Sequence, residues 1–303
     1  MTSQRLPLPT RDGVGPSCVG LPQGAWPTIT EFLIERFPAI TREAWMARME
    51  AHDVVDEHGV PVTAQRSYQA PLRVYYYRTL DAEVRIPFDE QVLFQDDQLL
   101  VVDKPPFLPV TPTGKYLQES LLVRLKRKLK LDDLVPLHRI DRSTAGLVLF
   151  SVHPETRGAY QAMFPERRIA KHYEAVVPWQ PGVSSVPGTY RSRLVDDDHF
   201  MRVKEEAGEP NSETRIAVQQ TAGGHALLAL SPVTGRKHQL RVHCMALGMP
   251  IVNDPFYPVL LPSGRDDFDK PLQLLAKSVA FQDPVSGELR SFTSPRSLAL
   301  PPR

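Results

Sequence analysis

An unbroken apolar run at residues 147–150 follows directly after a cluster of ionisable side chains. Such a run is typical of a strand that is buried on both faces. His138, Arg139 and Asp141 precede it. An ionised side chain beside a buried strand costs free energy, so such a side chain is expected to have a partner of opposite charge or a function. This stretch therefore predicts a central strand with a candidate functional site where the strand begins.

Other apolar patterns predict further elements along the main part of the chain. Residues 98–106 contain an apolar strand that stops at two prolines, because proline cannot continue a ladder of hydrogen bonds. The alternation of polar and apolar residues at 171–177 predicts another strand. The remaining expected elements are a basic amphipathic helix at 117–130, a helix near 154–163, successive strands within 189–233, and a C-terminal hairpin at 274–292.

The N-terminal part has a different character. Glycines and prolines in the first 26 residues predict irregular chain. Apolar positions between residues 28 and 40 recur at helical intervals, a second helix is expected from Thr41, and residues 54–62 predict a short hairpin that turns at Gly59. The expected organisation is an irregular extension at 1–26, a small α+β domain at 27–86 and a main domain at 87–303.

Composition narrows the class of protein. The chain has 303 residues, of which 42% are hydrophobic, so it is expected to be globular. Its 2 cysteines, Cys18 and Cys244, have neither metal spacing nor a disulfide framework, which favours a reduced, cytoplasmic compartment. No stretch has the length and apolar character of a signal peptide core or a membrane span.

The charge is balanced in total but uneven along the chain. The formal net charge is +1, whereas residues 124–130 and 167–171 are basic and residues 196–198 and 205–206 are acidic. One face of such a surface can bind a polyanion such as RNA or DNA. A solvated amphipathic helix with ordinary surface charge explains the same pattern, so charge alone leaves both interpretations open.

Residues 234–248 predict a helix that is buried on most sides. Gly235 suits a turn before the helix, and Gly248 suits its C-terminal cap. The apolar residues are Leu240, Cys244 and Leu247 on one side, with Val242 and Met245 on the other. A helix that is apolar on several sides is largely buried, and this one carries Arg241.

A buried Arg241 requires an anion nearby, because a guanidinium does not lose its proton. Asp141 is the natural candidate, since it also has apolar neighbours on one side. An adjacent cation lowers the pKa of a carboxylic acid, so Asp141 is expected to stay ionised. The alternatives are a turn or cap role for Asp141 and a purely structural ion pair for Arg241.

Several motifs resemble those of the RluA family of RNA pseudouridine synthases. The sequence His-Arg-Ile-Asp at 138–141, with Ser-Thr-Ala-Gly-Leu shortly after, resembles the family's central motif, HRLD followed by a Thr/Ser-Gly-Leu segment. Lys104-Pro105 and Lys171-His172-Tyr173 resemble lighter motifs. The resemblance extends over about residues 90 to 300, although Thr111 stands where the family commonly has a histidine. It implies an α+β fold with a mixed, mostly antiparallel sheet, flanking helices and an RNA cleft.

The resemblance implies a role for each matched residue. Asp141 is the expected catalytic residue, acting either as a nucleophile on base or sugar or as a base, with Arg241 as its partner. Tyr173 is expected to stack on the target base. The expected substrate-binding residues are Arg139, His138, Lys171, Arg236 and His238. Structural alternatives remain: a salt bridge for Arg139, packing for His138, and a surface or capping role for Lys171, Arg236 and His238.

The expected activity is the isomerisation of uridine to pseudouridine at specific sites in structured ribosomal or transfer RNA. The reaction is redox-neutral, and we expect no cofactor, no metal, no membrane contact and no obligate protein partner, with a monomer as the working unit. The region at 27–86 resembles the small RNA-binding domain named after ribosomal protein S-four, although a helical packing module fits as well. Two other functions remain open: a non-catalytic RNA-binding protein, and a hydrolase that releases uracil from RNA.

Overall fold

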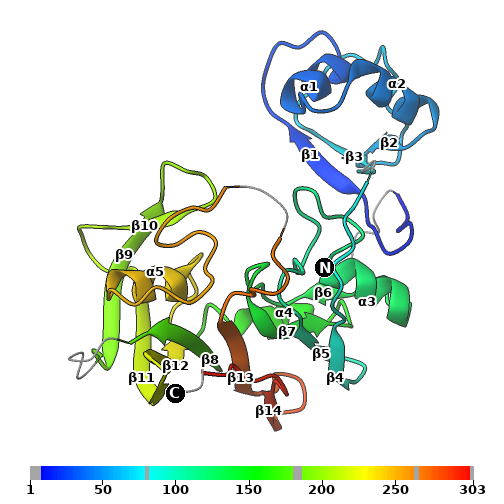
Figure 1. The fold of residues 1–303 in the computed structure, drawn as a ribbon. Coiled ribbons are helices and arrows are strands. Elements are labelled where there is room, and N and C mark those ends of the chain that lie inside the picture. Colours follow the sequence, from blue (N-terminus) through cyan, green and yellow to red (C-terminus); the bar gives the residue numbers. More distant parts are fainter. Residues whose placement is uncertain (1–7, 79–81, 180–185, 263–265, 301–303) are drawn as a thin grey trace. The chain divides into compact units, whose positions relative to one another are not determined.

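The computed structural model describes residues 8–78, 82–179, 186–262 and 266–300. The chain divides into two compact units, each of which is described by itself (Figure 1). The first comprises Met1–Val84, Pro112–Glu119 and Val123–Asp132, and the second comprises Arg85–Thr111, Ser120–Leu122 and Asp133–Arg303. None of the described helices is long and apolar enough to cross a membrane.

The first unit packs two helices against a small sheet. Its elements are β1 (Ser17–Leu21), α1 (Ile29–Arg36), α2 (Arg42–Glu50), β2 (Val54–Asp56) and β3 (Leu72–Tyr76), with the antiparallel sheet in the order β1-β3-β2. Both helices begin where a threonine hydroxyl accepts a backbone N–H, at Thr28 and Thr41. The fully buried indole of Trp45 lies at the centre of the core. The expected pair of helices and the turn at Gly59, with φ of +79°, are therefore present.

Part of the expected irregular extension is a strand. Residues Ser17–Leu21 pair with β3, so the prediction of irregular chain was wrong for them. The strand lies at the edge of its sheet and buries only Leu21 fully, which explains why its apolar alternation is weak. The first 7 residues of the expected extension lie outside the described residues.

The basic helix is shorter than expected, and its residues are divided between the two units. It is α3 (Leu121–Leu129), and most of it groups with the first unit, although residues 87–303 were expected to form one domain. The carboxylate of Glu83 accepts the backbone N–H groups of Leu117, Gln118 and Glu119. These three residues are therefore held in a turn and do not begin the helix.

The second unit is built on a sheet of 11 strands in which all pairs are antiparallel except β7 with β13. This confirms the expected mixed, mostly antiparallel sheet. The main path runs β10-β9-β11-β12-β8-β13-β7-β5-β4, with β14 beside β13 and β6 beside β7. The strands are β4 (Gln91–Gln95), β5 (Leu99–Lys104), β6 (Val135–Pro136), β7 (Ala145–Ser151), β8 (Ile169–Pro178), β9 (Thr189–Asp196), β10 (Val203–Glu206), β11 (Ser212–Ala222), β12 (His225–Pro232), β13 (Leu274–Gln282) and β14 (Leu289–Thr293).

Helices cover the two halves of this sheet. Tyr160 and Met163, on and just after α4 (Arg157–Ala162), pack against apolar residues of β5, β7, β8 and β13. Leu240 and Cys244 of α5 (Gln239–Ala246) pack against β8, β11 and β12. Figure 1 shows α5 beside the yellow and green strands of its half of the sheet. Both helices were expected from the sequence.

The strand β7 is central, as the apolar run predicted. All of its residues are buried, with β5 on one side and β13 on the other. Gly146 makes this packing possible, because its φ is +109° and a Cβ at this position would lie 2.3 Å from the carbonyl oxygen of Ala276. Only glycine accepts both the left-handed backbone and the close approach of β13.

The change Gly146→Ala should lower the free energy of unfolding by about 3 kcal/mol or more, because the added methyl group meets rigid backbone. Urea denaturation followed by circular dichroism measures this. The control is Gly158→Ala on α4, where no atom lies within 4 Å of the new Cβ. Equal stabilities of the two variants would contradict the role given to Gly146.

Candidate active site

Asp141 lies in a turn just before the central strand. Its backbone carbonyl accepts the N–H of Thr144 at 3.1 Å, and its side chain is 30% exposed. Lys104, which is fully buried at the end of β5, holds this turn in place. The Nζ of Lys104 donates to the carbonyl oxygens of Pro105, at 2.9 Å, and Arg142, at 3.1 Å. The Asp141 turn is therefore supported by a buried side chain, while the Asp141 carboxylate remains partly open to solvent.

Arg241 binds Asp141, as the sequence predicted. Its side chain is 1% exposed, and its Nη1 donates to Oδ2 of Asp141 at 3.0 Å. The planar group also lies over the rings of Phe256 and Tyr257, with Cζ 4.8 and 5.3 Å from their centroids. These aromatic faces favour the cation and leave its plane little freedom to turn.

A second carboxylate holds Arg241 from the other side. Asp254, whose side chain is fully buried, accepts from Nε at 2.8 Å and from Nη2 at 2.6 Å. It also accepts the backbone N–H groups of Phe256 and Tyr257, which fixes the turn that follows it. The bidentate pairing was not foreseen. Although burial opposes the charge, Asp254 and Asp141 together raise the pKa of Arg241 above its ordinary value.

Tyr173 lies on β8 in the same part of the sheet. It is opposite Ala276 of β13, and Ala276 is opposite Gly146 of β7, so these three residues follow one another across the sheet. Burial raises the pKa of the Tyr173 phenol, and the nearby charge of Asp141 raises it further. The hydroxyl therefore stays protonated at neutral pH.

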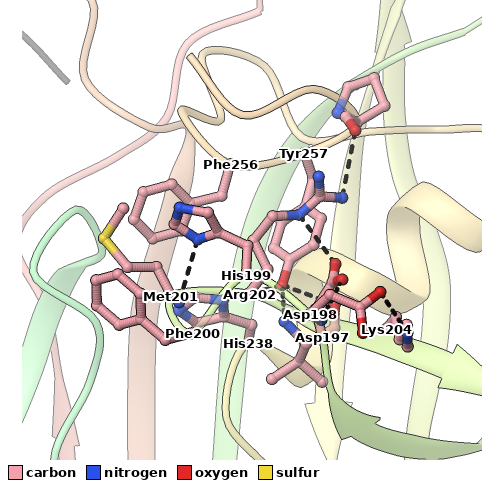
Figure 2. A network of polar contacts seen from close by, with 12 residues as sticks. Asp197, Asp198, His199, Phe200, Met201, Arg202, Lys204, His238, Phe256 and Tyr257 are labelled. Atoms are coloured by element: carbon pink, nitrogen blue, oxygen red, sulfur yellow. Dashed lines mark hydrogen bonds and ion pairs between the residues drawn. The ribbon is translucent and has the colours of Figure 1, made fainter. Parts of the chain in front are cut away.

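His238 occupies the position just before α5 with a left-handed backbone, φ +53°. Its Nδ1 is 3.0 Å from the hydroxyl of Tyr257, and its Nε2 is 3.8 Å from Oδ2 of Asp141. Figure 2 shows this ring beside Tyr257 and Phe256. Burial lowers the pKa of His238 to about 4, so the ring is neutral at neutral pH. It is poorly suited to bind phosphate as a cation.

His138 has a structural contact. Its Nε2 accepts the backbone N–H of Leu149 at 3.1 Å, which fixes the residue to β7. A nitrogen that accepts from an amide carries no proton of its own, and burial lowers the pKa of His138 to about 3. Of the two roles left open by the sequence, this contact favours the structural one.

The three remaining predicted residues are cations near the site. Arg139 is exposed and has no hydrogen bond or ion pair among the described residues, which disfavours the structural salt bridge. Lys171 is half-buried, and its Nζ is 3.8 Å from the position a Cβ would take at Gly235. Arg236 follows Gly235 and is exposed. The structure thus brings Lys171 and Arg236 to the same turn, although they are far apart in the sequence.

Residues 98–246 match the family model for RNA pseudouridylate synthase. The chain is 32% identical over 209 residues to the dual-specificity RNA pseudouridine synthase RluA of Escherichia coli K12, covering 67% of this chain and 92% of that protein. The chain belongs to the RluA family of RNA pseudouridine synthases. Members of this family isomerise uridine to pseudouridine in RNA, and the matched range contains the positions of Asp141, Tyr173 and Arg241.

Other similar proteins are also named as pseudouridine synthases. The ribosomal large subunit pseudouridine synthase C of Pasteurella multocida is 30% identical over 261 residues, which cover 82% of this chain and 74% of that protein. The solved structure of human RNA pseudouridylate synthase domain containing 1 is similar with a TM-score of 0.57 and 25% identity, covering 71% of this chain and 86% of the human one. The large sheet is therefore the family's catalytic fold.

Replacing Asp254 should destabilise the enzyme strongly. The change Asp254→Asn removes one of the two anions that hold a buried guanidinium, so we expect a loss of about 3 kcal/mol in the free energy of unfolding. Urea denaturation measures the loss. The control is Asp267→Asn, which breaks the exposed ion pair with Lys270 at 3.3 Å and should cost less than about 0.5 kcal/mol. A cost for Asp254→Asn as small as that of the control would contradict this view of the site.

Stability should fall in mild acid because of buried histidines. Burial lowers the pKa values of His138, His238 and His243 to about 3, 4 and 4, from 6.5. Between pH 6.5 and 4 the unfolded chain binds more protons than the folded one, so stability is fully present above pH 6.5 and is lost as the pH falls. His243, which bonds only hydroxyl groups, tests this.

In the variant His243→Gln, the loss of stability between pH 6.5 and 4.5 should be smaller than in the wild-type protein by about 2 kcal/mol. Urea denaturation at a series of pH values in one buffer system measures the difference. Parallel pH profiles of the two proteins would show that His243 does not titrate in this window.

Proposed function

We propose that this enzyme converts specific uridines in structured ribosomal or transfer RNA to pseudouridine, with Asp141 as the reacting group. The observation that supports this assignment is the contact of Asp141 with Arg241. Asp141 is a partly exposed carboxylate at 3.0 Å from a guanidinium that is itself 1% exposed. Such a pair holds one carboxylate in a fixed direction while it stays accessible to solvent.

The reaction needs an anion but no external reagent. The bond from C1′ of the ribose to N1 of uracil breaks, and a bond from C1′ to C5 forms. The proton on C5 leaves, and N1 takes one proton, so atoms and electrons balance. An ionised Asp141 can attack the sugar or the base as a nucleophile, or accept the C5 proton, whereas a protonated acid does neither well.

Arg241 is proposed to act through Asp141 and not on the substrate. Its Nε and Nη2 donate to Asp254, and its Nη1 donates to Asp141. This contact fixes the direction of the Asp141 carboxylate. Correct orientation of a reacting group reduces the entropic part of the barrier.

Tyr173 is proposed to contact the target base. The base must leave its stack before Asp141 can reach it, and an aromatic ring offers a face on which any base can stack. Because burial and Asp141 keep the hydroxyl protonated, Tyr173 can donate a hydrogen bond or a proton but cannot act as a base at neutral pH.

The cations around the site are proposed to hold the RNA. Arg139 is exposed and carries no internal ion pair among the described residues, so its guanidinium is available to support the flipped nucleotide. Lys171 lies against the turn at Gly235, which Arg236 follows, and these two cations suit a phosphate. His238 and His138 are neutral, and we now assign them to positioning Tyr257 and β7 instead of to phosphate binding.

The change Asp141→Asn should abolish turnover while RNA binding and folding persist. We expect the rate of pseudouridine formation to fall at least about a thousandfold, because the amide neither attacks nor accepts a proton. The assay incubates ribosomal and transfer RNA from a strain lacking the gene with each protein and maps pseudouridine chemically. Asp267→Asn serves as the control and should retain full activity.

The same assay separates the alternatives. A wild-type protein that binds RNA but modifies none would be a non-catalytic binding protein. Free uracil, detected by chromatography, would identify a hydrolase. Normal pseudouridine formation by Asp141→Asn would remove Asp141 from its proposed role.

A further inference from the structure

A pair of stacked aromatic rings, of which Phe200 is exposed and His199 is partly buried, lies at the tip of the hairpin that joins β9 and β10. We call residues 197–202 the hairpin tip. Phe200 is 80% exposed, and its ring lies against that of His199, with 5.1 Å between centroids and 21° between planes. Figure 2 shows the two rings close together at the edge of the polar network. Single exposed apolar side chains are common on protein surfaces, and what distinguishes Phe200 is the imidazole ring stacked against it.

The hairpin tip is held in one conformation by its own polar groups. The N–H of Arg202 donates to the carbonyl of His199 at 2.8 Å, and the N–H of Met201 donates to Nδ1 of the His199 ring at 3.3 Å. Arg202 also pairs with Asp197 at 3.5 Å. The imidazole is therefore fixed, and it covers one face of Phe200 while leaving most of the phenyl ring in solvent.

Two contacts attach the hairpin tip to the segment that carries the active site. Lys237 donates from Nζ to the carbonyl of Phe200 at 2.9 Å. Val203 exchanges backbone hydrogen bonds with the hydroxyl of Tyr257, at 2.8 and 3.0 Å. The same hydroxyl meets His238, and His238 is 3.8 Å from Asp141. The aromatic pair is thus fixed at the margin of the catalytic residues and does not swing freely.

The charges around the hairpin tip suit an anionic partner. In the run of three aspartates at 196–198, Asp197 pairs with Arg202 and Asp198 pairs with Lys204 at 3.2 Å, which offsets two of the three negative charges. Arg236 and Lys237, just before α5, are both exposed. A neutral aromatic platform beside exposed cations is the combination that binds an unpaired nucleotide, with the ring stacking on the base and the cations near the phosphate.

We propose that Phe200 stacks on an unpaired base of the RNA substrate, next to the uridine that is modified, with His199 as the backing of the stack. This inference rests on the proposed function, because it assigns the contact to the same RNA. The hairpin tip then contributes to the choice of substrate: it favours targets in loops whose neighbouring base is free to leave its own stack.

The experiment compares Phe200→Ala, Phe200→Leu and Phe200→Trp with the wild-type full-length protein. Leucine keeps an apolar surface but has no aromatic face, whereas tryptophan keeps and enlarges the face. The matched control is Leu289→Ala, because Leu289 is 81% exposed and begins β14 on a different hairpin. Binding is measured by fluorescence anisotropy of fluorescein-labelled octauridylate, and catalysis is measured on whichever ribosomal or transfer RNA the wild-type protein modifies.

For Phe200→Ala and Phe200→Leu we expect the Kd for octauridylate to rise by about 5- to 100-fold, the range for the loss of one stacked base. Phe200→Trp and Leu289→Ala should bind like the wild-type protein. The slope of log Kd against log salt should be the same in all variants, because stacking releases no counterions. On the substrate RNA, KM should rise for Phe200→Ala while kcat changes less than about twofold, since the ring does not touch the reacting atoms.

Three results would overturn the inference. Phe200→Leu could bind as tightly as the wild-type protein, which would show that apolar area alone matters. Phe200→Ala could leave both Kd and KM unchanged. Sedimentation could show that the wild-type protein self-associates through Phe200 while RNA binding does not depend on it, which would make the hairpin tip a protein contact.

The two hypotheses can fail separately. If the wild-type protein makes no pseudouridine in any RNA, the proposed function is wrong, and the octauridylate measurements still decide whether Phe200 stacks on bases. If the wild-type protein modifies RNA and the Phe200 variants behave like Leu289→Ala in both assays, the function stands and the stacking contact is rejected.

Discussion

The burial of one positive charge governs the arrangement of the catalytic unit. Arg241 is almost fully enclosed and cannot lose its proton, so the fold must supply anions to it. It takes one from the turn before β7 and one from the loop after α5. The same guanidinium therefore ties the α5 segment to the start of the central strand. The orientation of Asp141 and the packing of the two halves of the sheet depend on one planar group.

The two carboxylates that bind Arg241 have different surroundings, so one is suited to a structural role and the other to the reaction that we propose. The Asp254 side chain is fully buried, binds two guanidinium nitrogens and two backbone N–H groups, and has little capacity left for a substrate. Asp141 receives only one guanidinium nitrogen and is 30% exposed. Asp254 accepts two of the three hydrogen bonds that Arg241 donates to these carboxylates, and Asp141 accepts the third and keeps lone pairs free for the reaction that we propose.

Much of this could be predicted from the sequence because it follows from local patterns. The apolar run at 147–150 identifies the central strand without reference to any other segment, and the pattern around α5 shows that Arg241 is buried and needs an anion. The pairing of Asp254 with Arg241 could not be predicted from the sequence. Asp254 also fixes a turn, which is sufficient to explain an aspartate at this position, and no local pattern indicates a contact between side chains on different segments. β1 was missed for a related reason: an edge strand with one buried residue leaves a weak pattern. The hydrogen bond of His138 to Leu149 likewise depends on how the chain folds back.

The position of β13 has a consequence for how the enzyme is made. β7 and β8 are neighbours along the chain, yet β13, which is made more than a hundred residues after β7, lies between them and joins them. Before β13 has been synthesised, the nascent chain contains two incomplete parts of the sheet. Each part has an open edge strand that can pair with the wrong partner. Closure depends on contacts between segments far apart in the sequence, which makes folding slow relative to helical domains of similar size. Chains that end before β13 therefore lack the strand that joins the two halves of the sheet.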